Sequence, residues 1–402
     1  MKTIAIAGTF DSKGTEYLYL KALIEEQGLK TFTIHAGVFE PEFEPDVSNA
    51  EVALAAGEDI KAVAAKKDRA WGTEVLTKGM EILVPKLYEE GKFDGIISMG
   101  GSGGTALVTP AMRALPVGVP KVMVSTMASG DTSRYVGTSD IVMIPSVVDV
   151  AGINSISSKI FANAAFAIAG MVSFENKQAI EHKPLIAATM FGVTTPCITM
   201  AKEYLEKQGY EVLVFHATGI GGQSMEALIR GGFIQGVLDL TTTEWCDEVV
   251  GGILAAGPHR NEAAALAGIP QVVSVGAVDM VNFGTYDSVP AQFAGRNLYK
   301  HNPSVTLMRT TVEENREIGK RLAEKLNMAT GETVLMLPLK GVSMIDAEGE
   351  AFYGPEEDQV LFDTLKSEIT NDKVKIIEMD AHVNDEEFAV GAAKKLLELM
   401  KA

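Results

Sequence analysis

Residues 3–36 read TIAIAGTFDSKGTEYLYLKALIEEQGLKTFTIHA, and this stretch decides the fold. The apolar run at 3–8 predicts a buried strand, and a polar turn follows it. Residues 15–27 carry apolar side chains at helical spacing, so they predict an amphipathic helix that Gly28 ends. A second apolar run at 31–36 completes a strand–helix–strand unit, which is typical of a parallel sheet covered by helices.

The same unit recurs later in the chain. Residues 185–217 align with 4–36 without a gap, and Gly28 falls on Gly209. Any two strand–helix–strand units share apolar runs and a glycine after the helix, so some matches are expected by chance. The matches nevertheless keep their order, which favours a duplicated unit over chance similarity.

The rest of the chain continues the alternation of strands and helices. A charged segment at 174–184 ends in a proline and suits a linker. We therefore predict an α/β fold of two similar Rossmann-like domains, 1–178 and 184–402, with parallel sheets and a cleft between them. The second domain is expected to carry one additional strand–helix pair after residue 330.

Composition and charge exclude several classes of protein. Hydrophobic residues make up 47% of the chain and charged residues 22%, which excludes fibrous and disordered proteins. A net charge of −18 repels phosphate backbones and anionic lipids, so we expect neither a nucleic-acid nor a membrane partner. Asp11 precedes any signal-peptide core, and the two cysteines form no disulfide framework. We expect a cytoplasmic protein.

A glycine-rich loop, Ser98-Met-Gly-Gly-Ser-Gly-Gly-Thr105, follows a short apolar strand. The bare N–H groups of Gly101–Gly104 leave room for a bulky anion, and Thr105 is expected to cap the next helix. This pattern predicts a phosphate or carboxylate cradle. It is not a Walker A loop, because no Gly-Lys-Ser/Thr follows. A turn that serves only tight packing of strand on helix is the alternative.

The turn after the first strand holds two charged candidates. Lys13 is a lone cation at a helix start, where the helix dipole already favours anions. Asp11 has three open roles: capping the helix, accepting a hydrogen bond from a ligand hydroxyl, or holding a metal-bound water. Farther along, Arg69 precedes an amphipathic helix and could clamp a phosphate from the side. A solvated surface charge is the alternative for both cations.

The second domain repeats the arrangement with other residues. Its first turn has lost the Asp and Lys and keeps hydroxyls and a thiol. The candidates for a second ligand are Thr194, Thr195, Cys197, His216, Gly221, Gly222, Thr242 and Glu244. A buried, inert thiol is the safer interpretation of Cys197, and a structural role is the safer one for His216. No standard catalytic set or metal-ligand spacing occurs, so the sequence identifies no catalytic residue.

Together these motifs resemble one known family. The stretches that carry the resemblance are DSK at 11–13, MGGSGGT at 99–105, ASG at 128–130, YVGTSD at 135–140, PSVVD at 145–149, GIN at 152–154, TMFGVTTPC at 189–197, FHATG at 215–219, GGFIQG at 231–236 and VDMVNFG at 278–284. They extend over essentially the whole chain. The sequence is similar to the ATP-binding domain family named after the tomato tobamovirus-resistance protein.

The resemblance implies nucleotide binding in the first of two Rossmann-like domains. Position by position, it implies that ATP, accompanied by Mg²⁺, contacts Asp11, Ser12, Lys13, Val38, Arg69, Gly101, Ser102, Gly103, Gly104 and Thr105. It also favours a homodimer. The leading hypothesis is an ATP-binding protein, an ATPase or an ATP-dependent enzyme that acts on an unknown small molecule. The alternatives are an enzyme of small carboxylates or sugar acids, and an interaction protein with structural ATP.

Overall fold

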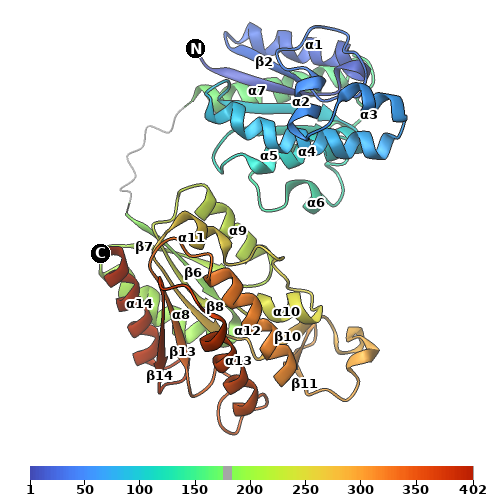
Figure 1. Ribbon diagram of the computed structural model, residues 1–402. Helices are drawn as coiled ribbons and strands as arrows, with labels where there is room; N and C mark the ends of the chain where they lie inside the picture. The colour runs from blue at the N-terminus through green and yellow to red at the C-terminus, as the bar shows by residue number, and fades with distance from the viewer. Residues whose placement is uncertain (175–182, 402) are drawn as a thin grey trace. The chain divides into compact units, whose positions relative to one another are not determined.

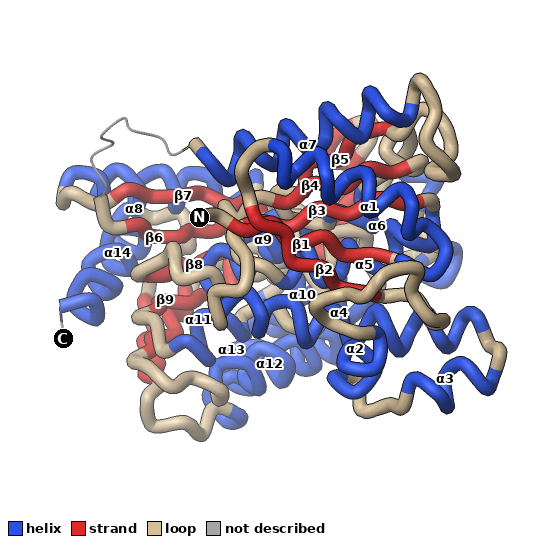
Figure 2. The backbone as a smooth tube through the Cα atoms, turned by 90° about the horizontal axis from the view of Figure 1, so that it is seen from above, coloured by secondary structure: helices blue, strands red, loops and turns tan. Residues whose placement is uncertain are grey.

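The computed structural model describes residues 1–174 and 183–401. The chain forms two compact units, Met1–Ala179 and Ile180–Ala402, each built around its own sheet (Figures 1 and 2). Most of the predicted linker at 174–184 lies outside the described residues. No helix in the described part of the chain is long and apolar enough to cross a membrane.

The first unit is a five-stranded parallel sheet with the order β2-β1-β3-β4-β5. Its strands are β1 (Thr3–Gly8), β2 (Lys30–His35), β3 (Gly95–Gly100), β4 (Lys121–Ser125) and β5 (Val142–Pro145). Its helices are α1 (Phe10–Glu26), α2 (Asn49–Ala55), α3 (Ile60–Lys66), α4 (Arg69–Glu89), α5 (Ser102–Ala114), α6 (Ser133–Val136) and α7 (Ser157–Ser173). The chain leaves β1 toward β2 and returns to β3 on the other side of β1. The strand order therefore reverses between β1 and β3.

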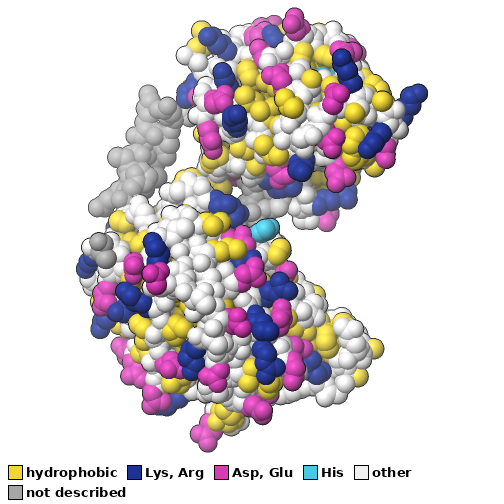
Figure 3. Space-filling view, in the orientation of Figure 1, with side chains coloured by type: hydrophobic (Ala, Val, Ile, Leu, Met, Phe, Trp, Pro, Cys, Tyr) yellow, Lys and Arg dark blue, Asp and Glu magenta, His cyan; other side chains and the backbone are white. Residues whose placement is uncertain are grey.

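Helices cover both faces of this sheet, as the alternation of side chains along β1 requires. Ile4 and Ile6 pack with α1 and α7, whereas Ala5 and Ala7 face the core formed with α2, α4 and α5. Figure 2 shows α7 and α1 on one side of the strands. On the face drawn in Figure 3, acidic and basic side chains are interspersed over the surface of the unit.

The second unit is a six-stranded parallel sheet, β14-β13-β9-β8-β6-β7, with a separate antiparallel sheet, β10-β12-β11. The parallel strands are β6 (Leu185–Met190), β7 (Glu211–His216), β8 (Gly236–Thr241), β9 (Gln271–Gly276), β13 (Thr333–Pro338) and β14 (Val374–Met379). The antiparallel strands are β10 (Met280–Phe283), β11 (Leu298–Asn302) and β12 (Val305–Arg309). Its helices are α8 (Thr195–Lys207), α9 (Ile220–Arg230), α10 (Glu244–Val250), α11 (Glu262–Ala267), α12 (Val312–Leu326), α13 (Pro355–Glu368) and α14 (Glu386–Lys401). The short 3₁₀ turns are Gly192–Thr194, Tyr286–Ser288 and Ala291–Phe293.

The two units begin alike, which confirms the prediction of two similar parallel α/β domains. In each, a central six-residue strand leads through a helix to a parallel neighbour at the edge. Gly28 and Gly209 both end that helix with positive φ, +78° and +91°. The parallel sheet of the second unit has one strand more than that of the first, and the additional pair, β14 and α14, follows residue 330 as predicted. The antiparallel sheet was not predicted, because the polar Lys300-His301-Asn302 end of β11 hides any strand pattern.

Candidate functional site

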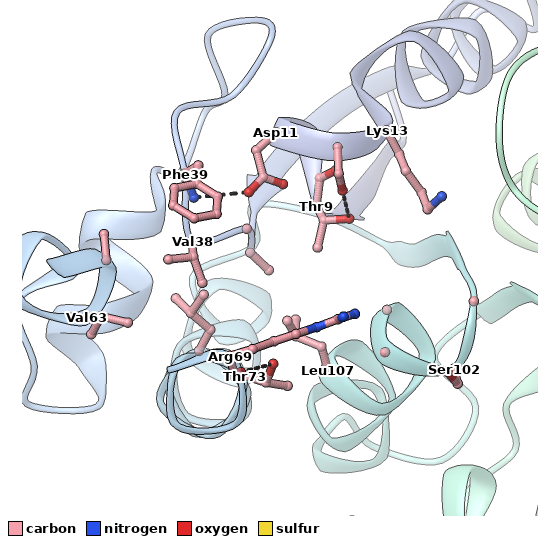
Figure 4. Close-up of a pocket in the computed structure, with 18 of the residues that line it drawn as sticks. Thr9, Asp11, Lys13, Val38, Phe39, Val63, Arg69, Thr73, Ser102 and Leu107 are labelled. Atoms are coloured by element: carbon pink, nitrogen blue, oxygen red, sulfur yellow. Dashed lines mark hydrogen bonds between the residues drawn. The ribbon is translucent and has the colours of Figure 1, made fainter. Parts of the chain in front are cut away.

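A cavity of about 640 Å³ lies at the carboxyl ends of β1 and β3 in the first unit (Figure 4). Parallel α/β sheets bind ligands where the strand order reverses, because the loops after the two central strands diverge there. The walls come from the turn after β1, the segment after β2, helices α3 and α4, and the start of α5. The lining residues are Thr9, Asp11, Ser12, Lys13, Ala36, Gly37, Val38, Phe39, Val63, Ala64, Lys67, Asp68, Arg69, Thr73, Leu76, Gly101, Ser102, Gly103, Gly104, Leu107 and Asp149.

Tyr17 lies between the ends of the two central strands, β1 and β3. β1 pairs with β3 only from Ile4 to Ile6. Beyond that point the Tyr17 hydroxyl donates to the carbonyl of Met99 at 2.5 Å and accepts from its N–H at 3.1 Å. Burial raises the pKa of Tyr17 to about 12, so the hydroxyl keeps the proton that this double contact needs. A Cβ at Gly8 would lie 1.9 Å from the hydroxyl oxygen, which explains a glycine at the strand end.

The glycine-rich loop presents the open end of a helix to the cavity. Gly101 is the N-cap of α5, and no side chain caps this helix, so its first N–H groups form a positive helix end. A Cβ at Gly103 would meet only the Arg69 guanidinium, 3.8 Å away. The glycines at 101–104 do not have positive φ. Their backbone conformation would accept residues with a side chain. The effect of having glycine here is to leave the space beside the helix start empty.

Thr105 does not cap α5 as predicted. The helix begins at Ser102, so Thr105 lies one turn inside it and is fully buried. Its hydroxyl donates to the Gly101 carbonyl at 2.8 Å and contacts the Ser125 hydroxyl at 2.6 Å. Thr105 therefore ties the glycine loop to the end of β4 and does not line the cavity.

Three cations line the cavity: Lys67 at the end of α3, and Lys13 and Arg69, which are considered for phosphate binding. Lys13 lies at a break in α1, with φ −141° and ψ 30°, and its ammonium donates to the Val150 carbonyl. Arg69 is the first residue of α4, whose N-terminus Asp68 caps through the N–H of Trp71. In Figure 4 the guanidinium of Arg69 extends into the cavity toward the start of α5. This cap holds the start of α4 in place, and Arg69 extends into the cavity from there.

Asp11 fixes the segment after β2 and does not cap α1. The cap position of α1 is Thr9, and no side chain caps that helix. One Asp11 oxygen accepts from the N–H of Phe39 at 3.0 Å, as drawn in Figure 4. A Cβ at Gly37 would lie 2.2 Å from the other oxygen. Of the three roles considered for Asp11, helix capping is wrong, and contacts to a ligand hydroxyl or a metal-bound water remain predictions.

The opposite wall of the cavity is apolar. Val38 packs against the core from the segment after β2, and the remaining aliphatic side chains come from α3, α4 and α5: Val63, Ala64, Leu76 and Leu107. The motifs did not reveal these four residues, because ordinary amphipathic helices supply them. One end of the cavity therefore attracts anions, and the opposite wall offers an apolar surface.

The second unit brings its sequence-predicted candidates into internal contacts. At the reversal between β6 and β8, the hydroxyls of Thr194 and Thr241 lie 2.8 Å apart and are fully buried. The Thr242 hydroxyl donates to the Ser274 carbonyl at 2.9 Å, and that of Thr195 donates to Phe191 at 3.2 Å. These hydroxyls are satisfied by the unit's own residues.

Glu244 is the first residue of α10, the helix after β8, and its side chain lies at the start of α9. Its buried carboxylate accepts from the N–H groups of Gly219, at 2.8 Å, and Gly222, at 3.1 Å, at the start of α9. Arg260 binds Glu244 at 2.5 Å and Asp239 at 2.5 Å. Burial acts to lower the pKa of Arg260, but these carboxylates hold it well above its ordinary value. An internal ion network therefore fills this place.

The remaining candidates of the second unit have structural surroundings. A Cβ at Gly221 would lie 1.8 Å from the His216 carbonyl, so this glycine permits close packing. The exposed His216 ring lies 5.6 Å from that of Phe191. Cys197 is buried, and burial raises the pKa of its thiol to about 12, which makes it unreactive. A ligand-binding role for these residues remains a prediction.

Sequence reasoning missed the ion network of Arg260 and, in the first cavity, Asp149. An aspartate inside the apolar strand Gly236–Thr241 was a usable signal for the network, because a buried charge needs a partner. Among residues 1–174 and 183–401, no group of three or more His, Cys, Asp or Glu side chains is arranged to hold a metal ion.

The family models divide the chain as the two units do. Residues 2–177 match the N-terminal domain, and 183–400 the C-terminal domain, of the uncharacterised protein family UPF0261. A UPF0261 protein from Clostridium tetani is 59% identical over 401 residues, which are 100% of this chain and 99% of that protein. The ToMV resistance protein Tm-1(GCR237) of Solanum lycopersicum is 47% identical over 337 residues, 82% of this chain and 45% of the tomato protein.

Similarity to solved structures is far weaker. A UDP-GlcNAc 2-epimerase of Methanocaldococcus jannaschii, in complex with UDP-GlcNAc and UDP, aligns with 99% of this chain and 93% of its own, with 9% identity and a TM-score of 0.23. This TM-score supports no argument about the ligand. The family models and the close relatives confirm the resemblance seen in the motifs, and the chain belongs to the UPF0261 family, with the tomato Tm-1 proteins among its homologues.

Proposed function

We propose that the N-terminal unit binds ATP in the cavity between the ends of β1 and β3. One observation carries the proposal: the uncapped start of α5, Lys13 and Arg69 converge on one end of a cavity whose other wall is aliphatic. Helix N-termini with free N–H groups and nearby cations are suited to phosphates. A volume of about 640 Å³ lies within the range of small-molecule sites.

In this proposal the triphosphate lies at the polar end and the adenine against the aliphatic wall. The glycines at 101–104 allow phosphate oxygens to approach the backbone, and Lys13 and Arg69 add charge-assisted contacts. Val38 and Leu107 contribute apolar surface for the base. Asp11 is left for a ligand hydroxyl or a metal-bound water. The proposal includes an ATPase or ATP-dependent activity on an unknown small molecule.

Oligomeric state, location in the cell and macromolecular partners can also be proposed. We propose a cytoplasmic homodimer without a nucleic-acid partner, since the net charge of −18 opposes binding to phosphate backbones. Sedimentation equilibrium would test the dimer, and a gel-shift titration with DNA and RNA would test the second point.

Isothermal titration with ATP and Mg²⁺ tests the proposal, and Gly103→Val is the decisive variant. A valine at this position would extend into the phosphate space without backbone strain, since φ is not positive and only Arg69 lies within 4 Å of the new Cβ. We expect native circular dichroism and loss of ATP binding.

Gly192→Val is the matched control. Gly192 lies in the turn after β6 of the second unit, has no neighbour within 4 Å of a new Cβ, and does not have positive φ. We expect this variant to bind ATP like the wild type. Wild-type affinity in a folded Gly103→Val variant would refute the site, and phosphate release measured in the same samples would separate turnover from binding alone.

A further inference from the structure

The loop after β5 adds a carboxylate to the cavity that no motif assigned. Val147 has φ +64°, and the N–H of Val148 donates to the carbonyl of Ser146 at 2.7 Å across it. Such a three-residue turn with a left-handed centre is rare and strained, above all for a β-branched residue. The Val147 side chain is 76% exposed, so packing does not compensate for the strain. Two residues later, Asp149 lines the cavity.

Contacts to α1 fix this loop at the polar end of the cavity. The Lys13 ammonium donates to the carbonyl of Val150, the residue next to Asp149. The Gly152 N–H donates to the buried carboxylate of Glu16 at 2.5 Å. Two residues of the first turns of α1, Lys13 and Glu16, therefore hold the loop. Lys13 is also the cation proposed to bind phosphate. Asp149 lies beside the place proposed for the phosphates.

Asp149 differs from the other two carboxylates of the cavity. Asp11 holds the N–H of Phe39, and Asp68 caps α4, so both position backbone segments. Within residues 1–174 and 183–401, Asp149 accepts one hydrogen bond, from the N–H of the next residue, Val150, at 2.8 Å. This contact leaves the second oxygen of the carboxylate for a ligand.

A carboxylate next to a triphosphate is unfavourable unless a cation lies between them. Mg²⁺ is usually held by one or two protein carboxylates together with phosphate oxygens and water. The donor set fits this pattern, because the part of the chain that the structure describes contains no group of three or more metal-binding side chains and the cavity has one uncommitted carboxylate. We infer that Asp149 is the protein ligand of the divalent cation that accompanies the nucleotide.

This inference rests on the proposed ATP site, and Asp149→Asn separates the two. Titrations with ATP would be run with Mg²⁺ and with EDTA. For the wild type we expect tighter binding with Mg²⁺. For Asp149→Asn we expect that gain to fall on the order of tenfold or more. Binding of metal-free ATP should stay equal or become stronger, because a negative charge has been removed, and it also shows that the variant is folded.

Asp131→Asn is the control, since Asp131 is an exposed carboxylate in the preceding loop and contacts the N–H of Ser133. It should keep the wild-type response to Mg²⁺. A second measurement replaces Mg²⁺ by Mn²⁺ and counts bound Mn²⁺ by electron paramagnetic resonance, which should require ATP and decrease in Asp149→Asn. An unchanged metal dependence in a variant that binds ATP overturns the role of Asp149 alone. A wild type that binds no ATP under either condition overturns the proposed function and this inference with it.

Discussion

The two units of this chain use the same sheet position in opposite ways. Where the strand order reverses in the first unit, the start of α5 is uncapped and opens on a cavity. At the corresponding place in the second unit, α10 follows β8 and begins with Glu244, whose carboxylate binds the N–H groups at the start of the neighbouring helix α9. The hydroxyls of Thr194 and Thr241 meet where the first unit has its open turn. The start of α5 is open to a cavity, and the start of α9 is satisfied by the chain itself.

The difference lies in where the cations are placed. In the first unit Lys13, Lys67 and Arg69 line the cavity. In the second, the main cation is Arg260, which is 2% exposed and is surrounded by Asp239, Glu244 and Glu226. A buried cation with several carboxylate partners stabilises the fold and is not available for an incoming anion.

The largest effect is expected for Arg260→Ala. Removal of the cation leaves the carboxylates of Asp239 and Glu244 buried without a partner, which typically costs about 3–5 kcal/mol. The two tryptophans make the measurement specific, because Trp71 lies in the first unit and Trp245 in the second. In a Trp71→Phe background, urea unfolding followed by fluorescence reports the second unit.

The control for Arg260 is Arg321→Ala, which breaks an exposed pair with Glu317 on one helix. That pair is worth less than about 1 kcal/mol. ATP binding should persist in both variants, since both residues belong to the second unit and neither lines the cavity of the first. Equal losses of stability in the two variants would mean that the ion network of Arg260 does not stabilise the second unit more than an exposed ion pair does.

The next effect is expected for Lys13→Ala. One charge-assisted contact to phosphate is worth about 1.5–3 kcal/mol, so the affinity for ATP should fall on the order of 10–100-fold. Lys78→Ala, which removes an exposed charge from the outer side of α4, is the matched control and should change the affinity little. Calorimetric titration of both variants measures the ratio. A loss of affinity that is the same in both would indicate a general electrostatic effect instead of a local contact.

The pH dependence of stability should come mainly from the second unit. Burial and the charge of Asp346 raise the pKa of Asp358 to about 9, and burial and Asp346 raise that of Asp279 to about 7. Both values exceed those of the unfolded chain, near 4. The folded unit therefore binds more protons, and its free energy of unfolding should fall by roughly 1–3 kcal/mol between pH 6 and 7.

Asp358→Asn tests this pH dependence, because the amide stays neutral and keeps the oxygen that accepts from Arg309 at 2.9 Å. The decrease in stability should become smaller in this variant. A residual decrease should remain, since burial also raises the pKa of Asp247 to about 7. Urea unfolding at several pH values, read from Trp245, gives the slopes. A slope that does not change in Asp358→Asn would contradict the assignment.

Much of the fold was predictable from sequence, because alternating apolar runs and the glycine at each helix end are local signals. Gly28 and Gly209 identified the repeat, and the glycines at 101–104 identified the loop that borders the cavity. Thr105 was misjudged, since a glycine-rich stretch gives no sign that the helix already starts at Ser102. The start is set by tertiary contacts, such as the bond to Ser125, that no local pattern contains.

Other parts of the site depend on contacts between distant segments. Asp149 reaches the cavity because a strained turn at Val147 and the bond from Lys13 direct the loop, and sequence gives no measure of backbone strain. Likewise, the partners of Arg260 lie 16 and 21 positions away, on α10 and β8. Residue types indicated where polar groups occur. They did not show whether a ligand or another part of the chain satisfies them.

The smallest effect is expected for Thr194→Ala, the residue that stands in the second unit where Lys13 stands in the first. Its hydroxyl contacts Thr241 and the backbone of Phe191, so its removal should lower the stability of the second unit by about 0.5–1.5 kcal/mol. The affinity for ATP should stay within about threefold of the wild type, because this hydroxyl contacts no phosphate in the proposed site. Calorimetry would also show the number of nucleotides bound, which should be one. A second ATP that is lost in Thr194→Ala would mean that the second unit has kept a ligand, and that Glu244 leaves the start of α9 when the nucleotide arrives.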